Sequence, residues 1–394
     1  MPYLIDVHCH LLNFQFVPDP FFNAHAPIRL KSRAPVREWL LRLRPTGWLA
    51  EILALWPTRK YNHLGELLAL LRKDMNEVAD ALNREMQLPG LPDAEIMLAT
   101  PLMMDLEAAC LSVAPEFPYR YQVKLMAEVA ARHPGRLMPF IMFDPRRRSA
   151  GELVIKALEQ LGFLGVKMYP ALGHHPDPNS LLNEPAISEQ LAMVYAHCQD
   201  HQVPITTHCS RGGAYSGDLI RCRPLVHEFS QPSSWQGVLR TFPNLRVNFA
   251  HFGGKFLEFD NPRSWCSQIL RLMREYEYVY ADLAYHDALV QEKASPPYWD
   301  ALRTLVESEL YRKRILFGTD WLMIRHTWSV EDYVRPFLHL PKLYLLQIAF
   351  KNPLDFLFPQ RELPNRLVRF YQSRDLAETA LPPWMSESLS WSWS

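Results

Sequence analysis

The chain has 394 residues, in which 42 lysines and arginines are balanced by 42 aspartates and glutamates. This length suits one large α/β domain that carries insertions. Because the net charge is zero, no overall field attracts nucleic acid or an anionic membrane, and we expect a small-molecule partner.

Neither the N-terminus nor the apolar segments indicate export or membrane insertion. The first residues lack the basic and then apolar pattern of a signal peptide. The longest apolar stretches, 96–114 and 342–358, are interrupted by charged residues. The six cysteines are scattered without a CxxC spacing or a disulfide-like cadence, which predicts reduced thiols. We therefore expect a cytoplasmic protein, and the sequence leaves homo-oligomer formation open.

Short β-rich runs recur along the chain, and helical patterns lie between them. The runs are 3–10, 96–105, 137–143, 164–169, 204–209, 245–252, 279–284 and 315–320. The helical patterns include 121–133, 151–161, 184–201 and 262–276. Strands that alternate with helices pair in parallel through right-handed crossovers. Eight such units predict an α/β fold, a closed (β/α)8 TIM barrel, rather than an open sheet.

The segment between the first two strands is too long for a strand-to-helix connection. It contains amphipathic helical patterns, for example at 36–43 and 64–86. The chain is therefore divided into a barrel at 1–12 and 94–360, a helical insert at 13–93 and a C-terminal extension at 361–394. Because the insert leaves the C-terminal end of a barrel strand, it is predicted to cap the active-site mouth. A simple packing role is the alternative.

The first strand ends in His8-Cys9-His10. Successive side chains of a strand alternate faces, so both histidines project the same way. Their separation suits two imidazoles that bind one cation, whereas Cys9 would face the helical layer. Taken alone, the pair could equally be a polar strand end.

Other strand ends carry polar residues, at the place where barrel enzymes keep their functional groups. They are Lys167 and Tyr169 on the fourth strand, His208 on the fifth, His251 on the sixth and Asp320 on the eighth. Each has a structural explanation by itself, such as a helix N-cap for Asp320. Together, three imidazoles and one carboxylate match a borderline divalent metal such as zinc, with room for water.

These motifs, in this order, resemble those of the amidohydrolase superfamily. They are Asp6-Val7-His8-Cys9-His10, Gly165-Val166-Lys167, Pro204-Ile205-Thr206-Thr207-His208, Ala250-His251-Phe252-Gly253-Gly254 and Phe317-Gly318-Thr319-Asp320. The similarity is closest to the amidohydrolase-related branch that includes aminocarboxymuconate-semialdehyde decarboxylase. It runs from Tyr3 to about Leu357 and leaves the insert unmatched.

By position, the resemblance implies that His8, His10, His208 and Asp320 bind one divalent metal and that His251 is an acid/base residue. In members with two metals, a carboxylated lysine at the position of Lys167 bridges the ions, and the sixth-strand histidine becomes a ligand. One ion is favoured here, and two remain the alternative.

The candidate substrate-binding residues are Lys167, Tyr169, Arg211 and His174, with His175 and Lys255 on neighbouring loops. A guanidinium at Arg211, beside the metal, could hold a substrate carboxylate through two hydrogen bonds. The basic run at 146–148 is interpreted as a solvated face.

The predicted function is metal-dependent hydrolysis of a small carbonyl compound, such as an amide, lactone or cyclic acid, by an activated water. Asp320 would accept a proton from that water, and His251 would stabilise the oxyanion. The first alternative is a nonoxidative decarboxylase or lyase of an unsaturated or aromatic carboxylate. The second is a catalytically idle barrel used for binding, against which the intact ligand set argues.

Overall fold

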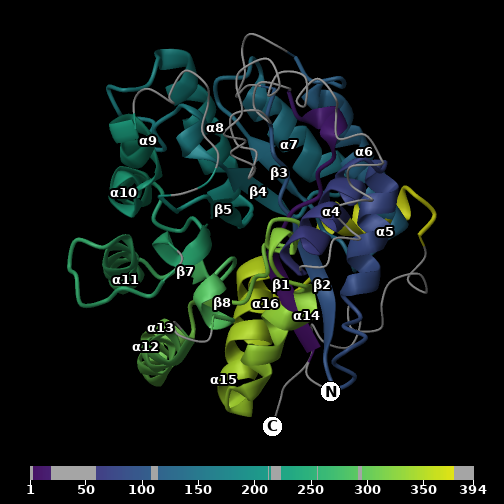
Figure 1. The fold of residues 1–394 in the computed structure, drawn as a ribbon. Helices are drawn as coiled ribbons and strands as arrows, with labels where there is room; N and C mark the ends of the chain where they lie inside the picture. Colours follow the sequence, from purple (N-terminus) through teal and green to yellow (C-terminus); the bar gives the residue numbers. More distant parts are fainter. Residues whose placement is uncertain are drawn as a thin grey trace, which may run out of the picture.

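The computed structural model describes residues 3–18, 59–107, 114–211, 213, 223–254, 256–291 and 295–376. Within these residues the strands are β1 (Tyr3–Cys9), β2 (Glu95–Pro101), β3 (Phe140–Phe143), β4 (Gly165–Met168), β5 (Ile205–Thr207), β6 (Val247–Phe249), β7 (Val279–Asp282) and β8 (Ile315–Leu316). Each matches one of the predicted β-rich runs. Figure 1 shows them at the centre of the molecule, with helices on the outside.

The strands are parallel and follow one another around a ring. β3 to β8 pair in sequence order, and β1 pairs with β2. Isolated parallel bridges join these two groups at both junctions, from Leu102 to Phe140 and from Cys9 to Trp321. The predicted TIM barrel is therefore confirmed, and the C-terminal ends of all the strands face the same end of it.

Helices lie around the outside of the ring and at its two ends. They are α6 (Tyr119–Arg132), α7 (Ala150–Gln160), α8 (Pro185–Asp200), α9 (Arg223–Ser230), α10 (Gln236–Thr241), α11 (Trp265–Glu275), α12 (Ser295–Glu307), α13 (Glu309–Arg312), α14 (Val330–Val334), α15 (Lys342–Leu346), α16 (Asn352–Leu357) and α17 (Asn365–Gln372). In α11 the buried residues include Trp265, Ile269, Leu272 and Met273. Their spacing of three to four residues places one apolar stripe against the strands.

Several strands end earlier than predicted on the side that carries the polar residues, and after two of them the backbone adopts positive φ values. The predicted run 245–252 stops at Phe249, because His251 and Phe252 have φ values of 60° and 47°. The run 315–320 likewise stops at Leu316, and Asp320 has a φ of 59°. Backbone in this left-handed region cannot continue a strand. The candidate residues therefore lie on tight turns just beyond the strands.

The predicted helix at 64–86 is wrong as a single helix. It is divided into α4 (Arg59–Leu71) and α5 (Met75–Glu85). Asp74 ends the first helical segment by capping the second, since its carboxylate accepts the amide of Glu77 at 2.9 Å and the Glu77 carboxylate accepts the amide of Asp74 at 3.2 Å. The predicted pattern at 36–43 lies outside the described residues.

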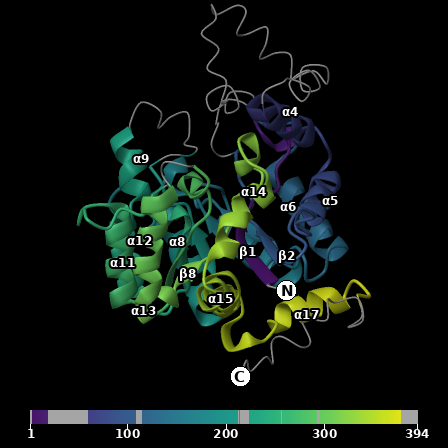
Figure 2. The same cartoon turned by 60° about the horizontal axis from the view of Figure 1, so that its bottom comes forward.

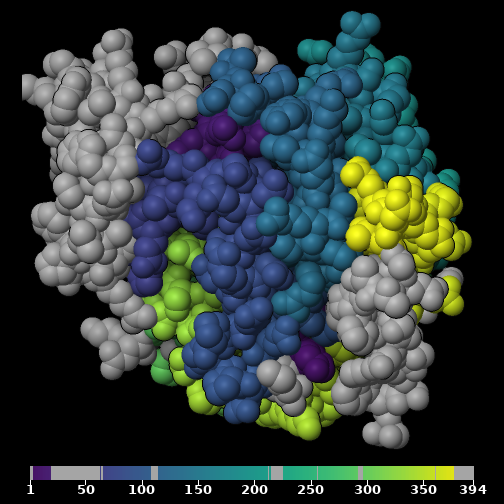
Figure 3. Space-filling model, turned by 90° about the vertical axis from the view of Figure 1, so that its right-hand side faces the viewer, coloured from purple at the N-terminus to yellow at the C-terminus, as the bar shows by residue number. Residues whose placement is uncertain are grey.

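The described part of the insert lies against the loop that follows β8. Helix α4 packs on the short helix η7 (Ile324–His326). Glu85, at the end of α5, accepts the indole N–H of Trp321 at 2.9 Å and pairs with Arg325. In Figure 2, α4 and α14 lie at the end of the molecule opposite to the N-terminus. Figure 3 shows the α4–α5 segment in dark blue over one side of the barrel.

Helix α17 occupies the other end of the barrel. The guanidinium of Arg366 donates to the carbonyl of Leu164, just before β4, at 2.6 Å. Leu367, Phe370 and Tyr371 are buried in the apolar cluster at this end. The Ser/Trp-rich tail lies outside the described residues. Among the helices of the described part, none is long and apolar enough to cross a membrane.

Glu85→Ala should destabilise the fold more than removal of a neighbouring surface carboxylate. The substitution leaves the buried indole N–H of Trp321 without its acceptor, which should lower the free energy of unfolding by about 1–3 kcal/mol. Glu66→Ala is the control, because Glu66 is 53% exposed and 3.6 Å from Arg325, so its loss should cost less than about 1 kcal/mol. Urea unfolding compares the two, and equal losses would contradict the role given to Glu85.

Candidate metal centre

Polar side chains at the ends of β1, β6 and β8 converge at the C-terminal end of the barrel. His10 Nε2 lies 3.3 Å and His8 Nε2 lies 3.7 Å from the same oxygen of Asp320, Oδ1. Ligand atoms of His8, His251 and Asp320 all lie within 4.8 Å of one another. The ends of β1, β6 and β8 thus bring His8 next to residues that lie 243 and 312 positions further along the sequence.

His208 lies next to this group, beyond His251. Its ring centroid is 5.2 Å from that of His251, with the rings edge to face. On its other side, His208 stacks on Tyr169 at 4.0 Å. The structure therefore brings His8, His251 and Asp320 together, with His10 beside Asp320, whereas His208 adjoins this group through the ring of His251.

Hydrogen bonds at the Nδ1 atoms orient three of the imidazoles. His10 Nδ1 lies 2.7 Å from the carbonyl oxygen of Leu102, and His251 Nδ1 lies 2.9 Å from that of Ala284. Because a carbonyl can only accept, each Nδ1 must donate. Burial lowers the pKa of both His10 and His251 well below the usual value. Both rings are therefore neutral near pH 7, with a lone pair on Nε2.

Asp282, which was not predicted as a site residue from the sequence, is fully buried at the end of β7. Its Oδ2 accepts from His8 Nδ1 at 3.0 Å and from Asn248 Nδ2 at 2.7 Å. Its Oδ1 accepts the amides of His251 at 2.9 Å and Ala284 at 3.1 Å. Burial raises the pKa of this carboxyl, but its interactions with His8, followed by those with His251, outweigh the effect of burial and hold the pKa well below the usual range. The sequence does contain one signal of this role, because an aspartate inside a predicted buried strand needs polar partners.

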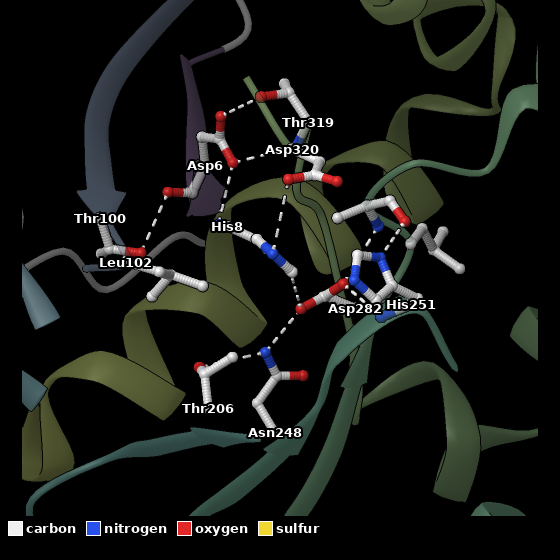
Figure 4. Close-up of polar contacts among 12 residues, drawn as sticks. Asp6, His8, Thr100, Leu102, Thr206, Asn248, His251, Asp282, Thr319 and Asp320 are labelled. Carbon is white, nitrogen blue, oxygen red and sulfur yellow. Dashed lines mark hydrogen bonds and ion pairs between the residues drawn. The ribbon is translucent and has the colours of Figure 1, made fainter. Parts of the chain in front are cut away.

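Asp6 ties β1 to the loop that follows β8. Its carboxylate accepts the amide of His8 at 3.0 Å and both the amide and the hydroxyl of Thr319, at 3.0 and 2.5 Å. Burial raises the pKa of Asp6 to about 6, and these hydrogen bonds oppose the shift. Figure 4 shows Asp6 and Asp282 on opposite sides of His8.

The arrangement of donors fits a divalent cation. His8 Nδ1 faces the carboxylate of Asp282, so its Nε2 is directed toward Asp320, and in the described part of the chain this buried nitrogen has no hydrogen-bond partner. Two imidazole nitrogens and a carboxylate oxygen then face one space, each backed by a hydrogen bond or a tight turn. Zinc and other borderline metals prefer this mixture of nitrogen and oxygen ligands.

Lys167 on β4 is fully buried, and its ammonium has no hydrogen-bond partner among the described residues. Its Nζ lies 5.7 Å from the ring centroid of Tyr169. Burial lowers the pKa of Lys167 to about 8. An unpaired buried amine is costly, and its presence marks a position that a ligand or a modification would complete.

The other predicted substrate residues have different surroundings. His174 is buried, neither ring nitrogen has a hydrogen-bond partner within the described residues, and burial lowers its pKa to about 4. His175 is largely buried and lies edge to face with Phe229. Arg211 is exposed, with its guanidinium 5.7 Å from the ring of Trp265. Lys255 lies outside the described residues.

The interpretation of 146–148 as a solvated face is wrong for two of the three arginines. Arg146 forms two hydrogen bonds with Asp144, at 2.9 and 2.6 Å. Arg147 binds Asp105 in the same way, at 2.9 and 2.8 Å. Both carboxylates are buried, so these guanidinium groups are fixed beside the ends of β2 and β3. The local sequence does not show which carboxylates pair with these arginines.

A comparison with protein families matches residues 5–343 to the amidohydrolase model. The chain belongs to the amidohydrolase family. This confirms the resemblance inferred from the strand-end motifs. Among curated proteins, none matches the chain.

Solved structures share the fold at low sequence identity. A 5-carboxyvanillate decarboxylase from Novosphingobium aromaticivorans, with bound manganese and 3-methoxy-4-hydroxy-5-nitrobenzoic acid, has a TM-score of 0.55 and 11% identity over 90% of this chain and 97% of its own. A 2,6-dihydroxybenzoate decarboxylase has a TM-score of 0.53 and 14% identity over 91% and 99%. A TIM-barrel protein from Bordetella bronchiseptica has a TM-score of 0.52 and 15% identity over 95% and 100%.

Lys167→Met should make the metal-free protein more stable near neutral pH. The folded pKa of Lys167, about 8, is below its ordinary value of 10.5, so below pH 8 the folded state carries the cost of a buried charge. Between these values the folded state has released the proton and the unfolded state has not, so the wild-type protein gains stability as pH rises. The variant should be more stable by on the order of 1–3 kcal/mol at about pH 7.

The difference between the two proteins should decrease at about pH 9.5. Chemical unfolding of chelator-treated wild-type and variant protein at both pH values measures it. An unchanged difference would contradict a buried, unpaired amine at this position.

Proposed function

We propose that this protein is a metal-dependent hydrolase of a small carbonyl compound that carries a carboxylate, such as an amide, a lactone or a cyclic acid. The observation that carries the proposal is the convergence of His8, His10 and Asp320, with imidazole lone pairs directed at one carboxylate oxygen. Membership of the amidohydrolase family supports the same reaction class.

The metal ligands in this proposal are His8, His10, His208 and Asp320, which would hold one ion. Zinc suits these ligands, and manganese, which the decarboxylase from N. aromaticivorans binds, is the alternative. When bound, the ion would acidify a water molecule and polarise the substrate carbonyl. Two ions would require a carboxylated Lys167 and His251 as a further ligand.

Two residues handle the proton in the proposed reaction. Asp320 accepts it from the attacking water, and His251 assists on the opposite side of the cluster. Because the Nδ1 of His251 donates to the carbonyl of Ala284, its Nε2 is an acceptor. A resting acceptor suits receipt of this proton from Asp320, followed by its transfer to the leaving group. This favours hydrolysis over protonation of a substrate carbon.

The substrate carboxylate would bind Lys167, whose buried ammonium lacks a partner among the described residues. Tyr169 and His174 would line the same pocket, and Arg211 would reach it from the loop after β5. The insert at 13–93 would form its cap. Contact of α4 with η7, and of Glu85 with Trp321, supports this position for the described part of the insert.

A decarboxylase of an aromatic or unsaturated carboxylate is the second candidate. It is favoured by the similar structures of two decarboxylases, one with bound 2,6-dihydroxybenzoate. A panel of substrates, assayed with the metal-loaded protein, distinguishes the two reactions by their products. Lactones and amides are followed by acid release, and hydroxylated benzoates by carbon dioxide release. Turnover of the first group supports hydrolysis, whereas turnover restricted to the second would replace it with decarboxylation.

His10→Ala and Asp320→Ala should each weaken Zn²⁺ binding by more than about 100-fold, because each removes a ligand and leaves the barrel core intact. His201→Ala is the control, because His201 is an exposed residue at the end of α8. Calorimetric titration of chelator-treated protein gives the affinity and the number of ions. Wild-type affinity in either ligand variant would contradict the proposed centre.

His251→Asn should reduce turnover of the best substrate in the panel by at least about 100-fold, since it removes the group that passes the proton to the leaving group. With one ion in the wild-type protein, the metal content should stay near one. With two ions, it should fall from near two, because His251 would then be a ligand. Rate and metal stoichiometry are measured on the same sample. Near-wild-type turnover would refute the role of His251.

A further inference from the structure

Asp282 connects two histidines that have different roles in the proposed mechanism. One carboxylate oxygen accepts from the ring of His8, and the other accepts from the backbone of His251. Asn248 and Ala284 supply the remaining donors, so each oxygen accepts two hydrogen bonds. The side chain is 0% exposed, and no solvent competes for these contacts. Figure 4 shows Asp282 between His8, Asn248 and His251.

On the His8 side, the carboxylate decides which ring nitrogen carries the proton. A carboxylate can only accept, so Nδ1 of His8 must donate and Nε2 keeps its lone pair toward Asp320. If an amide N–H faced Nδ1 instead, Nδ1 would have to accept. The ring proton would then move to Nε2 and occupy the position at which a metal would bind.

On the His251 side, Asp282 stabilises a strained turn. His251 and Phe252 are consecutive residues in the left-handed region, at φ values of 60° and 47°, a conformation that costs about 1–3 kcal/mol for each residue. Three groups from β7 and the loop after it hold His251. Asp282 accepts its amide, the carbonyl of Ala284 accepts from its ring, and Nε2 of His286 lies 2.9 Å from its carbonyl.

We propose that Asp282 is a positioning residue that sets both the tautomer of His8 as a metal ligand and the backbone turn that presents His251. A single carboxylate thereby couples the geometry of the ligand to that of the acid/base residue. The inference rests on the proposed metal-dependent function, and its first test needs no metal.

The first test measures the tautomer of His8 in metal-free protein by NMR with ¹⁵N-labelled histidine. The His8 signals are those missing from His8→Gln. The wild-type protein should carry the ring proton on Nδ1, and Asp282→Asn should carry it on Nε2. A wild-type proton on Nε2, or the same tautomer in both proteins, would overturn the proposal. The wild-type tautomer alone can overturn the proposal, so the test remains valid if the Asp282→Asn variant fails to fold.

The second test measures Zn²⁺ affinity without substrate, by competition with a chromogenic chelator. Asp282→Asn should bind about 10–100-fold more weakly than wild type, the usual effect of losing a carboxylate behind a ligating histidine. Asp105→Asn is the matched control. Asp105 is also a fully buried carboxylate at this end of the barrel, and both of its oxygens accept hydrogen bonds from Arg147. The Zn²⁺ affinity of Asp105→Asn should stay within about twofold of wild type.

The outcomes separate the two proposals. Wild-type affinity in Asp282→Asn, or an equal loss in Asp105→Asn, would overturn the role of Asp282 while leaving the metal centre in place. A wild-type protein that binds no Zn²⁺ would instead contradict the proposed function. The tautomer of His8 would then decide the role of Asp282 by itself.

Discussion

The close approach of β1 to the loop after β8 is the constraint on which the site depends. Asp6 holds this junction through the amide and hydroxyl of Thr319. Gly318 permits it, because a Cβ there would lie 2.9 Å from the Cβ of His8. The junction closes the barrel and, in doing so, sets the histidines of β1 against Asp320. Closure of the fold and assembly of the ligand cluster are therefore the same structural event.

Conformational strain is concentrated where the chain turns away from the strands. His251, Tyr285 and Asp320 have φ values of 60°, 59° and 59°, one after each of β6, β7 and β8. Strain of this kind persists only where the surroundings hold the backbone in place. The carboxylate of Asp282 accepts the amide of His251, and the carbonyl of His8 accepts the amide of Asp320. The interior near the site is consequently rich in charged and polar groups that a core built for stability alone would not contain, such as the ammonium of Lys167, which has no hydrogen-bond partner among the described residues.

Sequence reasoning predicted the barrel and the strand-end cluster because both depend on local periodicity. The alternation around His8 and His10 fixes their common face, and strand ends of a parallel barrel meet at one end. It did not find Asp282, since nothing local shows which histidine a buried carboxylate will meet 274 residues away. It also missed the break at Asp74, where an N-cap outweighs a continuous amphipathic pattern, and the carboxylates paired with Arg146 and Arg147.

The central claim is that one metal ion lies among the imidazoles of β1 and β5 and the carboxylate after β8. Anomalous diffraction from crystals soaked in Mn²⁺ locates such an ion without reference to any substrate. The account predicts one strong peak within bonding distance of His8, His10, His208 and Asp320, with His251 beside it. Two peaks bridged by a modified Lys167 would change the metal count. Strong peaks only elsewhere on the protein, with this cluster empty, would contradict the account.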